Sequence, residues 1–205
     1  MKIKTLEVAG FASAIHAMRN PMDSWNRSDT VQGKIGQKDK ELSKKLANAG
    51  AEHAKHLRMI MVWADIIAPR YWWAEADTYR IGVEKVSCST MHKLMAKPLT
   101  VDDFQIDYAS SEIASLCMSL NWKMKAYEDE QDPDAKKEIW REIIQLLPQS
   151  YLQKRTVMMS YAALRNIYRQ REGHKLKEWH LFREWVETLP ESWMITEGED
   201  HGFFS

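Results

Sequence analysis

The side chains with the most chemical potential are concentrated in one polar stretch, DTYRIGVEKVSCSTMHKL, at positions 77–94. It contains a basic residue at Arg80, hydroxyls at Thr78, Ser87 and Ser89, a thiol and a histidine. Guanidinium groups and hydroxyls donate the hydrogen bonds that phosphates and carboxylates accept. The stretch therefore predicts a loop that binds an anionic ligand, with solvated polar surface as the alternative.

Three other groups of reactive side chains have simpler explanations. His53 and His56 are one helical turn apart, as metal ligands can be, but no acidic residue is spaced to complete a site, so we expect no bound metal. Asp102 and Asp103 stand where a helix start explains them. Cys88 is a lone thiol, and lone thiols are seldom nucleophiles. We therefore assign no catalytic side chain from these groups.

Composition excludes several classes of protein. The 205 residues are 44% hydrophobic and 28% charged, which suits a single domain over residues 1–205 with a real core. Lysine plus arginine equals aspartate plus glutamate at 29 each, so no overall field attracts nucleic acid or an anionic membrane. Two cysteines are too few for a disulfide framework. No signal peptide and no run of about eighteen apolar residues is present, and we expect a cytoplasmic protein.

The N-terminal half alternates strands and helices. Residues 3–8 predict a strand, and residues 39–58, rich in lysine, alanine and leucine, predict an exposed helix. The apolar and β-branched residues 59–68 predict a buried strand. Pro69 suits the first position of a helix, so the next helix is expected to carry Arg80 at its C-terminal end.

The C-terminal half is predicted to be mostly helical. Helix starts are expected at Thr100 with Asp103, at Asp132 with Pro133, and at Ser150 with Gln153. The last of these begins a helix over residues 151–171 with an apolar stripe at three- and four-residue spacing. A final helix ends at Pro190, and residues 195–205 are expected to form a mobile tail.

The order of several segments resembles the flavin-dependent thymidylate synthase family over residues 43–100 and 146–188. The segments are LANAGAEHAKHLRMIMVWADIIAPRYWWAEADTYR, IGVEKVSCSTMHKL, a Leu-Pro pair and LRNIYRQREGHKLKEW. In that family a Glu-His precedes an apolar strand, a helix ends in Arg-His-Arg, and a serine follows. This chain has Thr78 and Tyr79 in place of the family's Arg-His, so cationic contacts of the family pattern are absent.

The resemblance implies two sets of binding residues. The cofactor-binding set is His56, Thr78, Tyr79, Arg80, Arg165, Asn166 and His174. The substrate-binding set is Glu75, Arg80, Ser87, Ser89, His92 and Arg171. Arginines from distant parts of the chain would then meet on one anionic ligand, because bidentate guanidinium contacts hold a phosphate strongly and directionally.

The resemblance also implies the chemistry and the architecture. Bound FAD would relay a one-carbon unit from methylenetetrahydrofolate to the C5 position of a dUMP-like pyrimidine deoxynucleotide, with NADPH as reductant and no protein nucleophile. The implied fold is α+β, with a small central sheet flanked by helices, in a homotetramer. Two alternatives remain: a related enzyme that makes another modified pyrimidine, and a catalytically retired member that acts as an oligomeric binding or structural protein.

Overall fold

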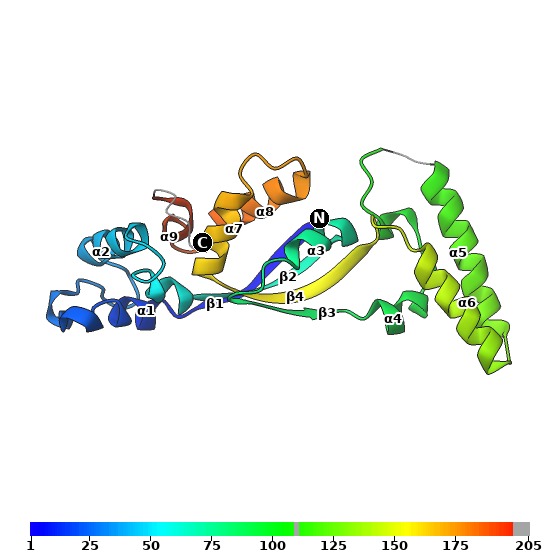
Figure 1. Ribbon diagram of the computed structural model, residues 1–205, viewed down its shortest axis with the longest axis horizontal. Coiled ribbons are helices and arrows are strands. Elements are labelled where there is room, and N and C mark those ends of the chain that lie inside the picture. Colours follow the sequence, from blue (N-terminus) through cyan, green and yellow to red (C-terminus); the bar gives the residue numbers. More distant parts are fainter. Residues whose placement is uncertain (109–110, 199–205) are drawn as a thin grey trace. The chain divides into compact units, whose positions relative to one another are not determined.

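The computed structural model describes residues 1–108 and 111–198, and only the backbone of His92. Within these residues, four strands form an antiparallel sheet in the order β1–β2–β4–β3, with helices beside it (Figure 1). The strands are β1 (Lys2–Ala9), β2 (Met61–Pro69), β3 (Val83–Ser87) and β4 (Leu152–Ser160). The predicted α+β class is confirmed.

The chain packs as two compact units. The α5–α6 unit contains Met1–Lys2, Ile67–Ala76 and Ser87–Arg155. The α7–α8 unit contains Ile3–Ile66, Asp77–Val86 and the described residues from Thr156 onward. The single domain that chain length favours stays a prediction.

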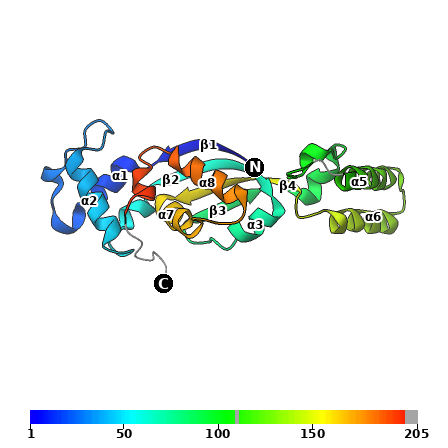
Figure 2. The same cartoon turned by 90° about the horizontal axis from the view of Figure 1, so that it is seen from above.

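In the α7–α8 unit, the core forms where helices cover the sheet. Side chains of β2 alternate between half-buried and buried, with Val62, Ala64 and Ile66 inward, because successive residues of a strand point to opposite faces. Helices α7 and α8 lie over this sheet in both views (Figures 1 and 2). The helices of the unit are α1 (Phe11–Ala17), α2 (Gln37–Asn48), α7 (Tyr161–Gln170), α8 (Lys177–Glu187) and α9 (Trp193–Thr196).

The α5–α6 unit has an apolar core of its own. Its helices are α3 (Arg70–Ala76), α4 (Thr90–Lys93), α5 (Ser111–Asp129) and α6 (Pro133–Leu146). Helices α5 and α6 lie side by side and bury Leu120 and Ile143, both fully inaccessible to solvent (Figure 1). The predicted start of α6 is confirmed, since the Asp132 side chain accepts a hydrogen bond from the Ala135 N–H.

Short turns of 3₁₀-helix complete the described structure. They are Asn20–Met22, Trp25–Arg27, Lys55–Arg58, Leu94–Ala96 and Val101–Asp103. The capping box predicted at Thr100 and Asp103 is present, but it begins only the last of these short turns.

The helix predicted over residues 151–171 is wrong in its first half. Residues Leu152–Ser160 form β4, and only Tyr161–Gln170 are helical. The N-cap is therefore Ser160, whose hydroxyl accepts from the Ala163 N–H at 3.1 Å, and not Ser150. The apolar stripe at helical spacing gave the wrong prediction for residues 152–160. Strand β4 lies between two other strands, and hydrogen bonding on both of its edges outweighs local helix propensity.

Two other helices are shorter than predicted. Helix α2 ends at Asn48, and Gly50 follows with φ of 119°, a conformation that favours glycine. Helix α3 ends at Ala76, so Arg80 lies in the connection between α3 and β3 instead of on the helix. The polar stretch of residues 77–94 is accordingly not a plain loop, because it contains β3.

Within the described ranges no helix is both long and apolar enough to cross a membrane. Of the predicted tail, residues 195–198 are described, and Ile195 and Thr196 belong to α9. The rest of the predicted tail, residues 199–205, lies outside the described residues.

Candidate functional site

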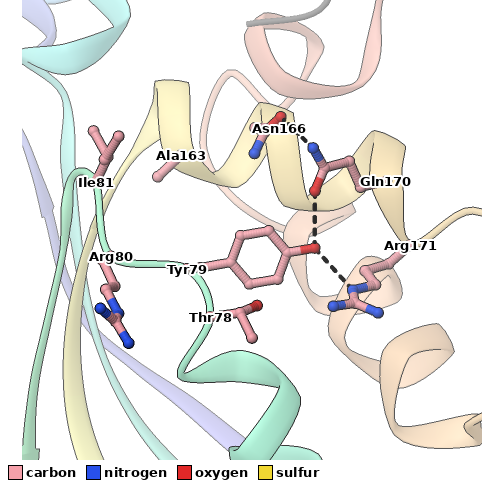
Figure 3. Close-up of a pocket in the computed structure, with 8 residues that line it drawn as sticks. All are labelled: Thr78, Tyr79, Arg80, Ile81, Ala163, Asn166, Gln170 and Arg171. Carbon is pink, nitrogen blue, oxygen red and sulfur yellow. Dashed lines mark hydrogen bonds between the residues drawn. The ribbon is translucent and has the colours of Figure 1, made fainter. Parts of the chain in front are cut away.

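The candidate site is a cavity of about 450 Å³ in the α7–α8 unit. Its walls are the connection that leads into β3 and the facing side of α7 (Figure 3). The lining residues are Thr78, Tyr79, Arg80, Ile81, Ala163, Asn166, Gln170 and Arg171. A cavity of this size falls within the range of small-ligand pockets.

A close backbone approach holds the two walls together. The Ser160 N–H donates to the Gly82 carbonyl at 2.9 Å, and the Ser160 hydroxyl caps α7. Gly82 has φ of 68°, and a Cβ at this position would lie 2.6 Å from Ser160 Oγ. Glycine is therefore required here, both for its backbone conformation and for the space beside the helix cap.

Arg171 and Tyr79 form one side of the cavity. Arg171 Nε donates to the Tyr79 hydroxyl at 2.8 Å, and the guanidinium carbon lies 4.5 Å from the centre of the Trp179 ring. Tyr79 in turn bonds Gln170 Oε1 at 3.1 Å, and Gln170 Nε2 donates to Asn166 Oδ1 at 3.1 Å (Figure 3). Stacking on an aromatic face and a directed hydrogen bond together fix the plane of the guanidinium.

Arg80 lines the cavity on the connection that leads into β3. It is exposed, and no described residue forms a hydrogen bond or an ion pair with its guanidinium group. Two guanidinium groups, from Arg80 and Arg171, thus line one cavity although they are far apart in sequence. The arrangement favours an anion that presents several hydrogen-bond acceptors.

The structure gathers only part of the residues that the resemblance implied. Thr78, Tyr79, Arg80, Asn166 and Arg171 line the cavity together. His174 is not in the described lining, but its ring lies 6.2 Å from that of Trp179, edge to face, and its Nδ1 accepts from the Leu176 N–H at 3.2 Å.

Arg165 and His56 lie in the interior instead. Arg165, 1% exposed, donates to the carbonyl oxygens of Met194 and Glu197 at 2.9 and 2.5 Å and to Asn48 Oδ1 at 3.0 Å. It therefore fastens the C-terminal segment to α2 and α7.

His56 is 3% exposed and its Nε2 hydrogen-bonds Ser43 Oγ at 2.8 Å. Its Nδ1 has no hydrogen bond of ordinary geometry to a described residue. Burial, reinforced by the positive charge of Arg165, lowers the pKa of His56 to about 4, so its ring is neutral at pH 7.

The remaining expected residues belong to the other compact unit. Glu75 lies on α3, Ser87 is the last residue of β3, and Ser89 precedes α4, all in the α5–α6 unit. His92 lies on α4, and its side chain is outside the described structure. Their part in a binding site stays a prediction.

The described residues also contain no cluster of three histidine, cysteine or acidic side chains that could hold a metal ion.

Sequence reasoning missed Gln170, which connects Tyr79 to Asn166. The signal was available, because Asn166 and Gln170 are four residues apart on α7 and share a face of the helix. It missed Ile81 and Ala163 as well, whose small apolar contributions to the wall leave no mark in the sequence.

Comparison with known proteins identifies the fold. No family model and no curated protein matches the sequence. Among solved structures, a flavin-dependent thymidylate synthase, ThyX, from Helicobacter pylori, complexed with FAD and dUMP, is similar with a TM-score of 0.74 and 20% identity, over 96% of this chain and 98% of that one. A second structure of ThyX from this organism, with FAD and dUMP, has a TM-score of 0.72 and 18% identity, over 96% and 98% of the two chains.

A third similar structure is the UMP/dUMP methylase PolB from Streptomyces cacaoi bound with 5-Br dUMP, with a TM-score of 0.61 and 12% identity, over 94% of each chain. The protein thus has an α+β fold shared with nucleotide-binding methylases. More particularly, its fold is that of the flavin-dependent thymidylate synthases, which confirms at the level of fold the resemblance seen in the sequence.

Proposed function

We propose that the protein is a divergent flavin-dependent thymidylate synthase that methylates dUMP to dTMP, or a closely related pyrimidine nucleotide at C5. It would use FAD as cofactor, methylenetetrahydrofolate as one-carbon donor and NADPH as reductant. The observation that carries the proposal is the meeting of Arg80, Asn166 and Arg171 in one cavity, on a fold similar over nearly its whole length to enzymes solved with FAD and dUMP.

The side chains of the cavity are chemically suited to FAD. Arg80 presents a guanidinium group to which no described residue is bonded, and it can donate to a phosphate or a ring carbonyl. Asn166 and the stacked Arg171 add donors from the opposite wall. Bound flavin would supply the redox chemistry of the methyl transfer, while these side chains bind and orient it.

The proposal is tested first by colour and then by product. The purified protein is expected to show the visible absorbance of oxidised flavin, directly or after FAD is added. Incubation with dUMP, methylenetetrahydrofolate and NADPH is then expected to yield dTMP, detected by mass. A colourless preparation that fails to take up FAD contradicts the proposal.

A changed nucleotide specificity has one observation in its favour. Thr78 and Tyr79 stand where the family pattern has Arg-His, so fewer cations are available to an anionic ligand. Parallel reactions with UMP and dCMP show whether another pyrimidine is methylated. If flavin binds but every nucleotide is recovered unchanged, and a thymidine-requiring host is not rescued, the catalytically retired alternative is favoured.

We also propose a homotetramer in solution, which light scattering coupled to gel filtration measures directly. The expected mass is four times the 24.0 kDa of the chain. A monomeric mass contradicts this part of the proposal and leaves the flavin test unaffected.

A further inference from the structure

The hydrogen bonds along the cavity wall have a fixed direction. An arginine Nε–H can only donate, so in its bond with Arg171 the Tyr79 oxygen is the acceptor. The single hydroxyl proton of Tyr79 is then directed to Gln170 Oε1. This leaves the Gln170 NH₂ group to donate to Asn166 Oδ1. A flip of either amide alone would place two acceptors or two donors opposite each other, so the orientations of Gln170 and Asn166 are coupled, and donation by the Tyr79 hydroxyl selects the one described here.

Asn166, at the end of this series of hydrogen bonds, presents a donor to the cavity. Asn166 uses its Oδ1 for Gln170, and its NH₂ group has no hydrogen bond to any described residue. In Figure 3 the Asn166 nitrogen points toward the space between α7 and the segment that carries Ile81, away from Gln170. A ligand atom at this point must therefore be an acceptor, such as a ring carbonyl oxygen.

We propose that Tyr79 and Gln170 are positioning residues, which hold the Asn166 amide with its NH₂ toward the cavity and so select a ligand that presents a ring carbonyl there. This rests on the proposed function, in which that ligand is the oxidised, dione-bearing ring of FAD. Tyr79 stands where the family pattern has histidine, so this arrangement depends on a residue in which the protein departs from the family pattern.

The physical argument is that an asparagine amide is nearly symmetric in shape but opposite in polarity at its two ends. A half-turn about its last bond replaces a donor with an acceptor at almost the same place. In a cavity, a ligand carbonyl that faces an amide oxygen leaves both groups unsatisfied, which costs more than the bond itself contributes. Holding the amide in one orientation before the ligand arrives therefore raises affinity without adding a contact.

Three variants, at two positions, interrupt this series of hydrogen bonds. Tyr79→Phe removes only the hydroxyl and keeps the ring that contacts Trp179 and Arg171. Gln170→Glu still accepts from Tyr79, but its carboxylate also accepts from Asn166, which turns the Asn166 oxygen toward the cavity. We expect FAD affinity to fall about fivefold in Tyr79→Phe and tenfold or more in Gln170→Glu, in fluorescence titrations. Gln170→Leu, with no added charge, is expected to resemble Tyr79→Phe.

The matched control is Tyr168→Phe. Tyr168 is on α7, like Asn166 and Gln170, and its hydroxyl bonds a side chain as that of Tyr79 does, donating to Glu187 Oε1 at 2.7 Å, but it is not in the described cavity lining. This variant is expected to bind FAD as the wild type does. An equal loss in Tyr168→Phe and Tyr79→Phe would overturn the proposal, since it would mark a general effect of removing a hydroxyl.

A ligand-free measurement separates this inference from the proposed function. The side-chain NH₂ resonances of Asn166, assigned by their absence in Asn166→Asp, are expected to shift in Tyr79→Phe and to stay in place in Tyr168→Phe. Unchanged resonances in Tyr79→Phe would overturn the proposal that Tyr79 positions the Asn166 amide, even if FAD binds. A wild-type protein that takes up no FAD contradicts the proposed function, whatever the resonances show.

Discussion

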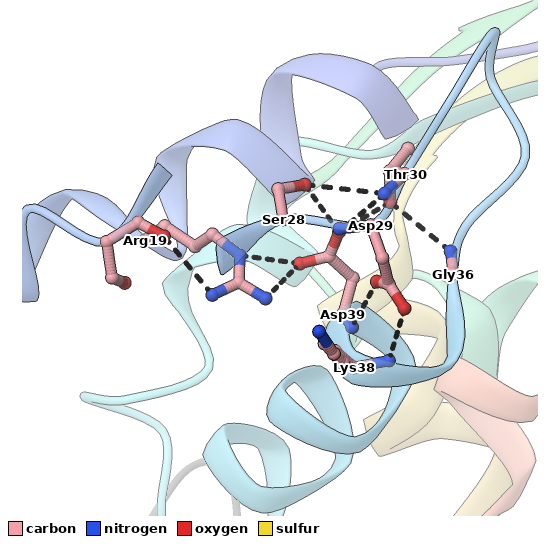
Figure 4. A network of polar contacts seen from close by, with 8 residues as sticks. Arg19, Ser28, Asp29, Thr30, Gly36, Lys38 and Asp39 are labelled. Carbon is pink, nitrogen blue, oxygen red and sulfur yellow. Dashed lines mark hydrogen bonds and ion pairs between the residues drawn. The ribbon is translucent and has the colours of Figure 1, made fainter. Parts of the chain in front are cut away.

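Two polar regions of the α7–α8 unit differ in whether the protein itself supplies hydrogen-bond partners for their polar groups. Around Asp39, at the start of α2, every partner is supplied by the protein (Figure 4). The Asp39 carboxylate is fully buried and accepts from Arg19, Ser28 and Thr30 side chains, at 2.6 Å from Arg19 Nε, 2.6 Å from Ser28 Oγ and 2.7 Å from Thr30 Oγ1. Backbone N–H groups of Asp29 and Thr30 complete the set.

The cavity contains hydrogen-bond donors that are available to a ligand. Arg80 has no partner among the described residues, and the Asn166 NH₂ group faces the cavity. The comparison teaches that the same residue types serve stability where their hydrogen bonds close internally and serve binding where they stay open. A substitution in the Asp39 region should lower the unfolding free energy without changing ligand affinity. A substitution in the cavity should lower ligand affinity without changing the unfolding free energy.

The largest effect is expected from Asp39→Ala. Removing the carboxylate leaves Arg19, only 5% exposed, as a buried charge without its partner. Loss of one member of a buried pair costs about 3–5 kcal/mol of unfolding free energy. Denaturant unfolding measures this, and FAD affinity below the transition should not change. Asp129→Asn, which breaks an exposed ion pair with Lys125, is the control and should unfold as the wild type does; equal stability of Asp39→Ala would break the comparison.

His56 is intermediate, because its Nε2 alone has a hydrogen bond of ordinary geometry to a described residue. Its folded pKa of about 4 is below the ordinary value of 6.5, so the unfolded chain takes up the proton first as the pH falls. Its contribution is fully present above pH 6.5 and is lost toward pH 4, a decrease of about 3 kcal/mol. Unfolding measured at several pH values checks this.

The control for His56 is a pair of substitutions. His56→Gln is expected to flatten the pH dependence between pH 6.5 and 4, whereas His53→Gln, at an exposed position, should keep it. Asp39 does not confuse the measurement. Burial opposes its ionisation, but the hydrogen bonds from Ser28, Thr30 and Arg19 prevail and hold the Asp39 pKa below its ordinary value of 3.8, so its own contribution is lost only at more acidic pH.

The smallest change in free energy is expected from Arg80→Ala. No hydrogen bond or ion pair to a described residue is lost, so the unfolding free energy should stay constant, while the affinity for FAD or for the nucleotide falls about tenfold, equivalent to about 1.4 kcal/mol. Arg80→Lys keeps the charge but not the forked donor, and should lose part of the affinity. A lower melting temperature with unchanged affinity would show instead that Arg80 is structural.

The sequence predicted well those features that depend on neighbouring residues. The strand at 59–68 carries its β-branched, apolar pattern wherever it lies, and β2 covers Met61–Pro69. Asp132 and Pro133 form a helix start from local hydrogen bonds alone. Residues 152–160 were wrongly predicted to be helical, because only their two neighbouring strands make them a strand.

The same distinction holds at the site. The sequence by itself determined the residue types and their order, Arg80 before Asn166 before Arg171, and from these an anion-binding function could be expected. Only the tertiary structure decided that Arg165 turns inward to backbone carbonyls, that Asp39 is buried, and that Tyr79 meets Arg171. The reason is physical: burial and hydrogen-bond partners depend on segments distant in sequence, whose meeting is set by the packing of the whole unit and not by any local pattern.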